Sequence, residues 1–261
     1  MFRCTTSPRA ADGRNLVATT LLCVGALLGP LAVHSQPLSG DGYLFKRPSG
    51  SFTLRGGYTQ PSASSDVFND SREFLTLDRG DFGSGSFTAE IGIRVAERLS
   101  LQFNGGLSKR SIQSEMRDWE DNAGLPIEQT TNLTRTPFMV GMRFDLLSPG
   151  RRIGQLAYIP SRISPYVAGG GGVMWYKYRQ AGSFVDFEDF SVFDTQLESK
   201  GTTGAAYGAL GADFTLRPTL ALTAEARYDY ARAPMNRESF SGFNNIDLSG
   251  VTATIGFTFR Y

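Results

Sequence analysis

Cysteine and histidine are nearly absent from this chain of 261 residues, which contains two cysteines and one histidine. All three, Cys4, Cys23 and His34, lie before Gln36. This first stretch starts with three arginines and one acid, continues as a mostly apolar run, and ends in small residues. That order is typical of a secretory signal peptide. We therefore predict that residues 1–35 are a cleaved signal peptide, with an uncleaved anchor helix as the alternative.

Removal of residues 1–35 would leave a mature chain with neither cysteine nor histidine. Disulfides, thiol chemistry and zinc sites of the usual ligands are then excluded, and we predict no cofactor and no metal site. Three of the 26 basic residues and one of the 25 acidic residues lie in the leader, so 23 and 24 remain, a net charge of −1. This balance argues against a nucleic-acid partner, which would favour a basic surface.

Long apolar runs are also missing after Val33, where no stretch approaches the roughly 18 residues of a helical membrane span. The strongest pattern is instead the alternation of Val251–Tyr261, in which every second residue is apolar. A period of two indicates a β-strand with one apolar face. Its 11 residues match the length that a tilted strand needs to cross a bilayer. A bacterial outer-membrane β-barrel would end on such a strand, because its last strand seals against its first. We predict that Phe257, Phe259 and Tyr261 form a C-terminal assembly signal that the barrel-assembly machinery recognises.

Seven further segments alternate in the same way. Together they predict an all-β chain, an eight-stranded antiparallel up-and-down transmembrane β-barrel over residues 36–261, with 36–49 as a periplasmic N-terminal tail. A soluble β-sandwich uses the same alternation and is the alternative fold. The eight predicted strands are 51–60, 85–96, 98–109, 134–147, 164–179, 203–216, 219–231 and 247–261.

The connections between these strands alternate in length. Glu97 and the pair 217–218 are tight turns, whereas the other connections are long. Short periplasmic turns and long extracellular loops are typical of outer-membrane barrels. The segment 148–163 breaks the pattern, and we predict an extended turn or short helix beneath the barrel mouth. The predicted extracellular loops are 61–84, 110–133, 179–202 and 232–246.

The strand faces opposite the apolar ones carry charged residues of both signs. Facing lipid, an arginine or lysine would cost about 2–4 kcal/mol at the bilayer midplane. Inside a barrel of eight strands, which is just wide enough for side chains to fill, these charges can pair. On the fifth strand this choice of face puts Lys177 inside and Tyr166, Met174, Tyr176 and Tyr178 outside. The predicted lumen charge network comprises Arg55, Glu90, Arg94, Arg143, Asp145, Lys177, Asp213, Glu225, Arg227, Asp229 and Arg260.

The glycine-rich segment Ser164–Tyr176, together with the aromatic C-terminus, resembles the outer membrane protein β-barrel domain families, which include the OmpA/OmpX-type and OmpW-like eight-stranded barrels. The resemblance implies the barrel fold and a location in the bacterial outer membrane. It implies no catalytic residue. We expect the partners to be outer-membrane lipid and lipopolysaccharide, and we expect a monomer.

One predicted loop is rich in phenylalanine, at Phe184, Phe187, Phe190 and Phe193. These rings would either form a contact surface for a partner or continue the hairpin and pack on neighbouring loops.

Barrel enzymes such as lipid A deacylases, outer-membrane phospholipases and omptin proteases rely on histidine, which the predicted mature chain lacks. The leading hypothesis is therefore a non-enzymatic barrel with a salt-bridge-plugged lumen and a structural or surface-interaction role. The alternative is an OmpW-like narrow conduit for small hydrophobic molecules.

Overall fold

The computed structural model describes residues 43–120, 124–154, 157–185 and 191–261. The predicted signal peptide, 1–35, therefore lies outside the described residues. No described helix has the length and apolar character that a membrane-crossing helix needs. The elements are β1 (Gly50–Pro61), α2 (Asp66–Phe74), η1 (Arg79–Phe82), β2 (Ser84–Arg94), β3 (Leu99–Glu120), β4 (Pro126–Asp145), β5 (Gly150–Ile153), β6 (Ala157–Pro160), β7 (Ile163–Val185), β8 (Val192–Arg217), β9 (Leu220–Ala233), β10 (Ile246–Asp247) and β11 (Gly250–Arg260).

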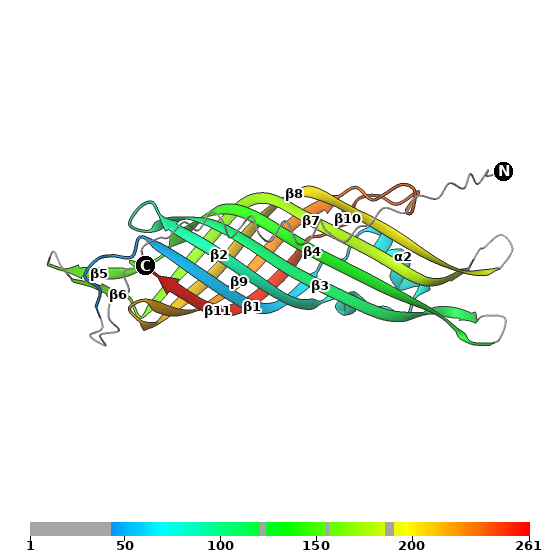
Figure 1. Ribbon diagram of the computed structural model, residues 1–261, viewed down its shortest axis with the longest axis horizontal. Coiled ribbons are helices and arrows are strands. Elements are labelled where there is room, and N and C mark those ends of the chain that lie inside the picture. Colours follow the sequence, from blue (N-terminus) through cyan, green and yellow to red (C-terminus); the bar gives the residue numbers. More distant parts are fainter. Residues whose placement is uncertain (1–42, 121–123, 155–156, 186–190) are drawn as a thin grey trace, which may run out of the picture. The chain divides into compact units, whose positions relative to one another are not determined.

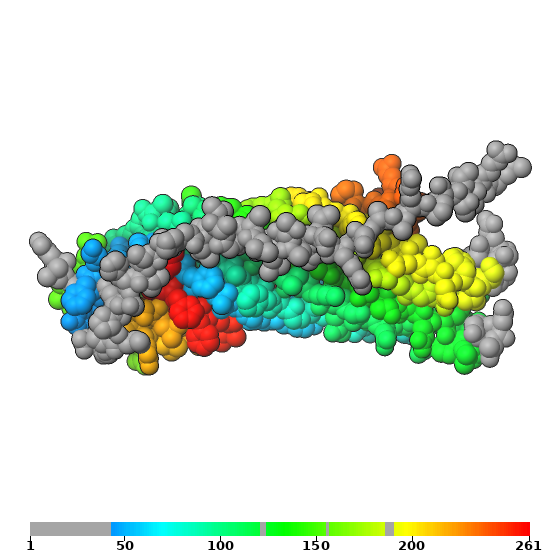
Figure 2. Space-filling view, in the orientation of Figure 1, coloured from blue at the N-terminus to red at the C-terminus, as the bar shows by residue number. Residues whose placement is uncertain are grey.

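Eight long antiparallel strands form a closed ring, which confirms the predicted fold class. Around the ring the order is β1, β2, β3, β4, β7, β8, β9 and β11, and β11 pairs back onto β1. The closing register places Phe52 opposite Phe259 and Thr59 opposite Thr252. Figure 2 shows the surface of β11, in red, directly against that of β1, in blue. Closure gives each of the eight strands a hydrogen-bonding neighbour on both sides within the ring, as a bilayer requires.

The period-two pattern decides which side chains face outward. On β11, Val251, Ile255, Phe257 and Phe259 are exposed, whereas Thr252, Thr254 and Thr258 between them are buried. The predicted assembly-signal residues, Phe257, Phe259 and Tyr261, therefore share the outer face of the barrel. Tyr58, Trp175, Tyr228 and Tyr230 are also exposed on the outside. This apolar and aromatic outer surface is the one expected of a barrel in lipid.

The two ends of the barrel differ, as Figure 1 shows. At one end, the turn end, β1 begins and β11 ends. Short turns at this end connect β2 to β3 and β8 to β9. At the other, the loop end, the β3–β4 and β7–β8 hairpins continue as paired strands well beyond the ring. Outer-membrane barrels place short turns in the periplasm and longer connections outside the cell.

Two predicted loops, 110–133 and 179–202, are in fact mostly continuations of strands. Lys109 to Glu115 pair with 128–134, and 179–185 pair with 192–198. The prediction stopped the strands where the outer face becomes polar. Above the membrane the outer face meets water, so the alternation persists while its apolar side changes from outside to inside. Ile112 and Met116 are buried there.

The segment 148–163 forms neither a simple turn nor the short helix that was one of its predicted forms. It contains the β5–β6 hairpin, which lies at the turn end of the barrel (Figure 1). Tyr158 of β6 is buried, and its backbone pairs with that of Leu44 in the segment before β1. The side chain of Arg47 lies over the Tyr158 ring, 5.8 Å from its centroid.

An apolar core fills the loop end of the barrel, around α2 from the first long connection. Phe68 of α2 is fully buried, and its ring centroid lies 4.8 Å from that of Phe82 and 5.8 Å from that of Tyr178. Ser71, one helical turn after Val67, lies 3.1 Å from the Tyr178 hydroxyl. The same face of α2 thus buries an apolar stripe and satisfies the tyrosine hydroxyl within the barrel.

Replacing Phe68 with alanine should lower the free energy of unfolding by about 3–5 kcal/mol, because a fully buried ring is removed and a cavity remains. The matched control is Phe193→Ala, which truncates an exposed ring on the same side of the membrane and should cost about 1 kcal/mol or less. Denaturant unfolding in detergent micelles measures both. Equal losses for the two variants would contradict the assignment of α2 to a packed core.

Candidate functional site

The lumen is the part of the molecule in which ionisable side chains converge. Of the eleven charged residues predicted to lie inside, the structure places ten there, Lys177 being the exception. It also adds Arg135, which the prediction omitted. The inward set therefore has six basic residues, Arg55, Arg94, Arg135, Arg143, Arg227 and Arg260, and five acidic residues, Glu90, Asp145, Asp213, Glu225 and Asp229.

Lys177 was assigned to the wrong face. Its side chain is 49% exposed on the outside of β7, where Nζ lies 2.9 Å from the Glu198 carboxylate. Three tyrosines and one methionine of β7 that were predicted to face lipid are instead buried inside: Tyr166, Met174, Tyr176 and Tyr178. The mistake has a physical cause: the lumen wall contributed by β7 is aromatic, so the more polar face of this strand is the outer one at its loop end.

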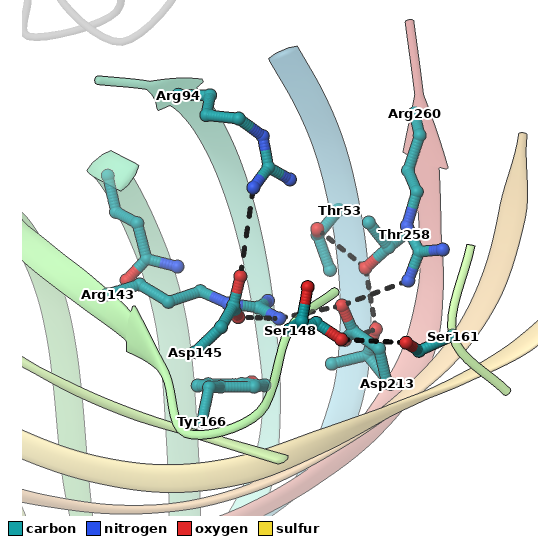
Figure 3. A network of polar contacts seen from close by, with 12 residues as sticks. Thr53, Arg94, Arg143, Asp145, Ser148, Ser161, Tyr166, Asp213, Thr258 and Arg260 are labelled. Carbon is teal, nitrogen blue, oxygen red and sulfur yellow. Dashed lines mark hydrogen bonds and ion pairs between the residues drawn. The ribbon is translucent and has the colours of Figure 1, made fainter. Parts of the chain in front are cut away.

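The turn-end layer of the lumen joins three arginines to two aspartates. Arg143 contacts Asp145 at 2.9 Å and Asp213 at 2.8 Å, and Arg260 contacts Asp213 at 3.3 Å. Arg94 approaches Asp145 at 3.9 Å. Figure 3 shows the three guanidinium groups reaching toward the two carboxylates. Both acids are thus shared between two arginines each.

The central layer has one arginine between two glutamates. Arg55 contacts Glu90 at 2.8 Å and Glu225 at 3.1 Å, and its side chain is 1% exposed. The second oxygen of the Glu90 carboxylate accepts a hydrogen bond from Gln102 at 2.6 Å. Glu225 accepts one from the Tyr166 hydroxyl at 2.8 Å. Buried carboxylates with this many partners are held in fixed positions.

The uppermost charged layer lies below the apolar core. Arg227 donates to Asp229 at 2.7 Å. Arg135 is buried and donates to the Thr59 hydroxyl at 2.8 Å, but it makes no ion pair with any described residue. Arg135 precedes the apolar part of β4 and shares the inward parity of Arg143 and Asp145, the signal that could have identified it from sequence.

Two small cavities lie among these layers. One cavity of about 40 Å³ lies at the turn end and another of about 40 Å³ lies around Arg135 and Arg227. A water molecule needs roughly 10–15 Å³ of such space, so each cavity has room for only a few waters. The described residues contain no group of three or more His, Cys, Asp or Glu side chains that could hold a metal ion.

The predicted phenylalanine surface is only partly described. Phe187 and Phe190 lie outside the described residues. Phe184 on β7 and Phe193 on β8 are opposite each other in the hairpin, with ring centroids 6.4 Å apart and planes 30° apart. Their rings stack across the extended hairpin, and Phe193 remains 46% exposed.

A closed ring of eight strands with an apolar outside and an ionic inside defines an integral outer-membrane β-barrel. The chain belongs to the outer membrane protein beta-barrel domain family, whose model matches residues 24–259. It is accordingly a protein of the bacterial outer membrane. No curated protein matches the sequence.

One solved structure with a similar arrangement is that of outer membrane protein OprG from Pseudomonas aeruginosa. It is 16% identical in sequence, and the match covers 84% of this chain and 99% of that chain, with a TM-score of 0.47. Neisserial surface protein A matches at 13% identity over 85% of this chain and 98% of its own, with a TM-score of 0.41. Outer membrane protease OmpT from Escherichia coli matches at 10% identity over 87% of this chain and 99% of its own, with a TM-score of 0.39. At these identities and scores, the similarities carry no functional assignment.

Arg55→Met should lower the free energy of unfolding by about 3–5 kcal/mol, because it leaves Glu90 and Glu225 buried near each other without their shared cation. Lys177→Met, which breaks an ion pair on the outer surface, should cost about 1 kcal/mol or less. Denaturant unfolding in micelles compares the two. A small loss for Arg55→Met would contradict the structural role of the central layer.

A pH dependence is expected at Asp247, in β10 at the loop end. Burial acts to raise the pKa of its carboxyl, but hydrogen bonds from Ser64 and Ser249 outweigh burial and lower the pKa below its usual value. A lowered folded-state pKa stabilises the protein above the unfolded pKa of about 3.9, and this contribution disappears as the pH falls through the folded value. Asp247→Asn should therefore have a lower melting temperature than the wild type at pH 7, and this difference should shrink as the pH falls. Thermal unfolding in micelles, followed by circular dichroism across this pH range, measures it. A difference in melting temperature that grows in acid would contradict the lowered pKa of Asp247.

Proposed function

We propose that this protein is a non-enzymatic barrel with a plugged lumen, which acts as a structural or surface-interaction protein of the outer membrane. The observation that carries the proposal is the filling of the lumen along its length. Three layers of charged side chains occupy the membrane region, and the apolar core around α2 occupies the loop end. Cavities of about 40 Å³ are too small for a wide water-filled pore.

The surface-interaction role is supported by the two hairpins that project beyond the ring. A β-hairpin whose strands are paired along their length presents fixed side chains at a distance from the membrane, at little further entropic cost. Phe193 on β8 offers an exposed aromatic side chain there. A partner of this protein would therefore bind to the projecting parts of the β3–β4 and β7–β8 hairpins.

Planar-bilayer recording tests the plug. The protein should give no steady single-channel current above that of the lipid alone in concentrated potassium chloride, because the ion pairs leave no continuous water column. Folding in the same preparation is checked by β-sheet circular dichroism. A steady open channel from the folded protein would refute the plug.

The alternative, a conduit for small hydrophobic molecules, has one specific feature in its favour. The β3–β4 ladder is interrupted opposite Pro137, which has no N–H to donate, and the pairing resumes at Ser108 and Arg135. The neighbouring cavity is lined partly by Phe87, Leu107 and Met174. Such an interruption in a barrel wall could open sideways toward lipid.

Pro137→Thr separates the two functions. Threonine supplies the missing N–H, so a lateral route at this position would close and uptake of a hydrophobic dye by liposomes containing the protein would fall toward that of empty liposomes. If the wild-type protein transports no dye, the conduit is excluded and the plugged barrel stands.

A further inference from the structure

The cavity at the turn end, here called the turn-end vestibule, lies where seven strands of the ring begin or finish. The β5–β6 hairpin lies at the same end and contributes Tyr158 to its lining. Figure 3 shows this region from close by, with side chains converging from several strands. The residues that the argument uses are Arg94, Arg143, Asp145, Ser164, Asp213 and Arg260.

The vestibule holds an excess of one positive charge. Its lining contains three arginines and two aspartates, and no third carboxylate is among its lining residues. Arg143 takes one oxygen of each aspartate at 2.9 and 2.8 Å. Arg94, whose side chain is 21% exposed, donates to the backbone oxygens of Pro48 at 3.2 Å and Glu97 at 3.1 Å, but its nearest carboxylate oxygen, on Asp145, is 3.9 Å away. An arginine keeps its charge at any accessible pH, so the excess cannot be removed by losing a proton.

A neutral donor in the same lining is unused. Ser164 is 1% exposed, and its hydroxyl has no hydrogen-bond partner among the described residues. An unpartnered buried hydroxyl costs free energy, and a bound acceptor would recover it. Ser164 on β7 and Arg94 on β2 both line the vestibule, so an anion bound there would accept from the free hydroxyl and offset the charge that Arg94 leaves uncompensated.

The rim outside the vestibule is also basic. Among the described residues of the turn-end connections, Glu97 is the one acid. A mouth surrounded by charge of one sign raises the local concentration of ions of the opposite sign. The exposed basic residues on this rim are Lys46, Arg98, Arg151, Arg152, Arg162 and Arg217.

We propose that the turn-end vestibule binds a phosphate group, carried either by a soluble periplasmic molecule or by a phospholipid headgroup. Two oxygens of a phosphate group can each accept a hydrogen bond from one planar guanidinium group. A phosphate oxygen also accepts hydrogen bonds from hydroxyl groups. Arg94 supplies the charge that Asp145 leaves uncompensated, and Ser164 supplies the neutral donor. Arg143 and Arg260 stay on the aspartates and fix the walls.

Nitrogen-15 NMR of the Arg94 side chain tests the proposal in two preparations. In maltoside micelles, which contain no phosphate, inorganic phosphate is titrated against chloride at constant ionic strength. In a second preparation of the same phosphate-free micelles, phosphatidylglycerol is titrated instead, with diacylglycerol as the lipid control that carries no phosphate. A saturable shift with inorganic phosphate identifies a soluble ligand, and a shift with phosphatidylglycerol alone identifies a lipid headgroup.

Ser164→Ala and Arg94→Gln should each weaken binding about ten-fold or more, since each removes a buried or charged hydrogen bond; with Arg94→Gln, the backbone amide shifts around the vestibule replace the lost signal. Arg151→Gln changes an exposed rim residue outside the lining and should weaken binding about two-fold at most. The proposal is overturned if neither probe shifts the signals, or if Arg151→Gln weakens binding as much as Ser164→Ala.

Discussion

The structure depends on the inability of hydrocarbon to solvate polar groups. Every backbone N–H and C=O in the membrane must pair within the barrel, which forces the eight strands to close between β1 and β11. The same constraint acts on the side chains. Arg55 and Arg143 are kept among carboxylates because an isolated guanidinium would be far more costly in lipid or in a dry lumen.

The interior divides into an ionic part and an apolar part. Charged layers occupy the region surrounded by lipid, and the core around Phe68 and Tyr178 occupies the loop end. This division follows from what lies outside. Where the outer face must be apolar, polar side chains accumulate inside; where the outer face meets water, the inside becomes an ordinary hydrophobic core. The barrel wall continues through this change without interruption.

Most of the fold could be predicted from alternation, because the period of two persists along each membrane-spanning segment, most clearly over Val251–Tyr261. What alternation cannot supply is the height at which the apolar face switches sides. That switch explains why residues 110–120 were expected to be a loop although they continue β3. It also explains the misassignment of Tyr178 and Lys177. Arg135 was missed because it lies near the same boundary, and the β5–β6 hairpin because short edge pairs leave little pattern.

The central claim is that lipid contacts one face of each strand while the other face is enclosed and ionic. Nitroxide labels at Ile255 and Thr254, introduced as single cysteines in a chain without Cys4 and Cys23, test it directly in liposomes. Electron paramagnetic resonance should find the Ile255 label open to dissolved oxygen, as lipid-exposed sites are, and the Thr254 label shielded from both oxygen and a water-soluble nickel relaxant. Equal oxygen access at both sites, or greater access at Thr254, would contradict the account.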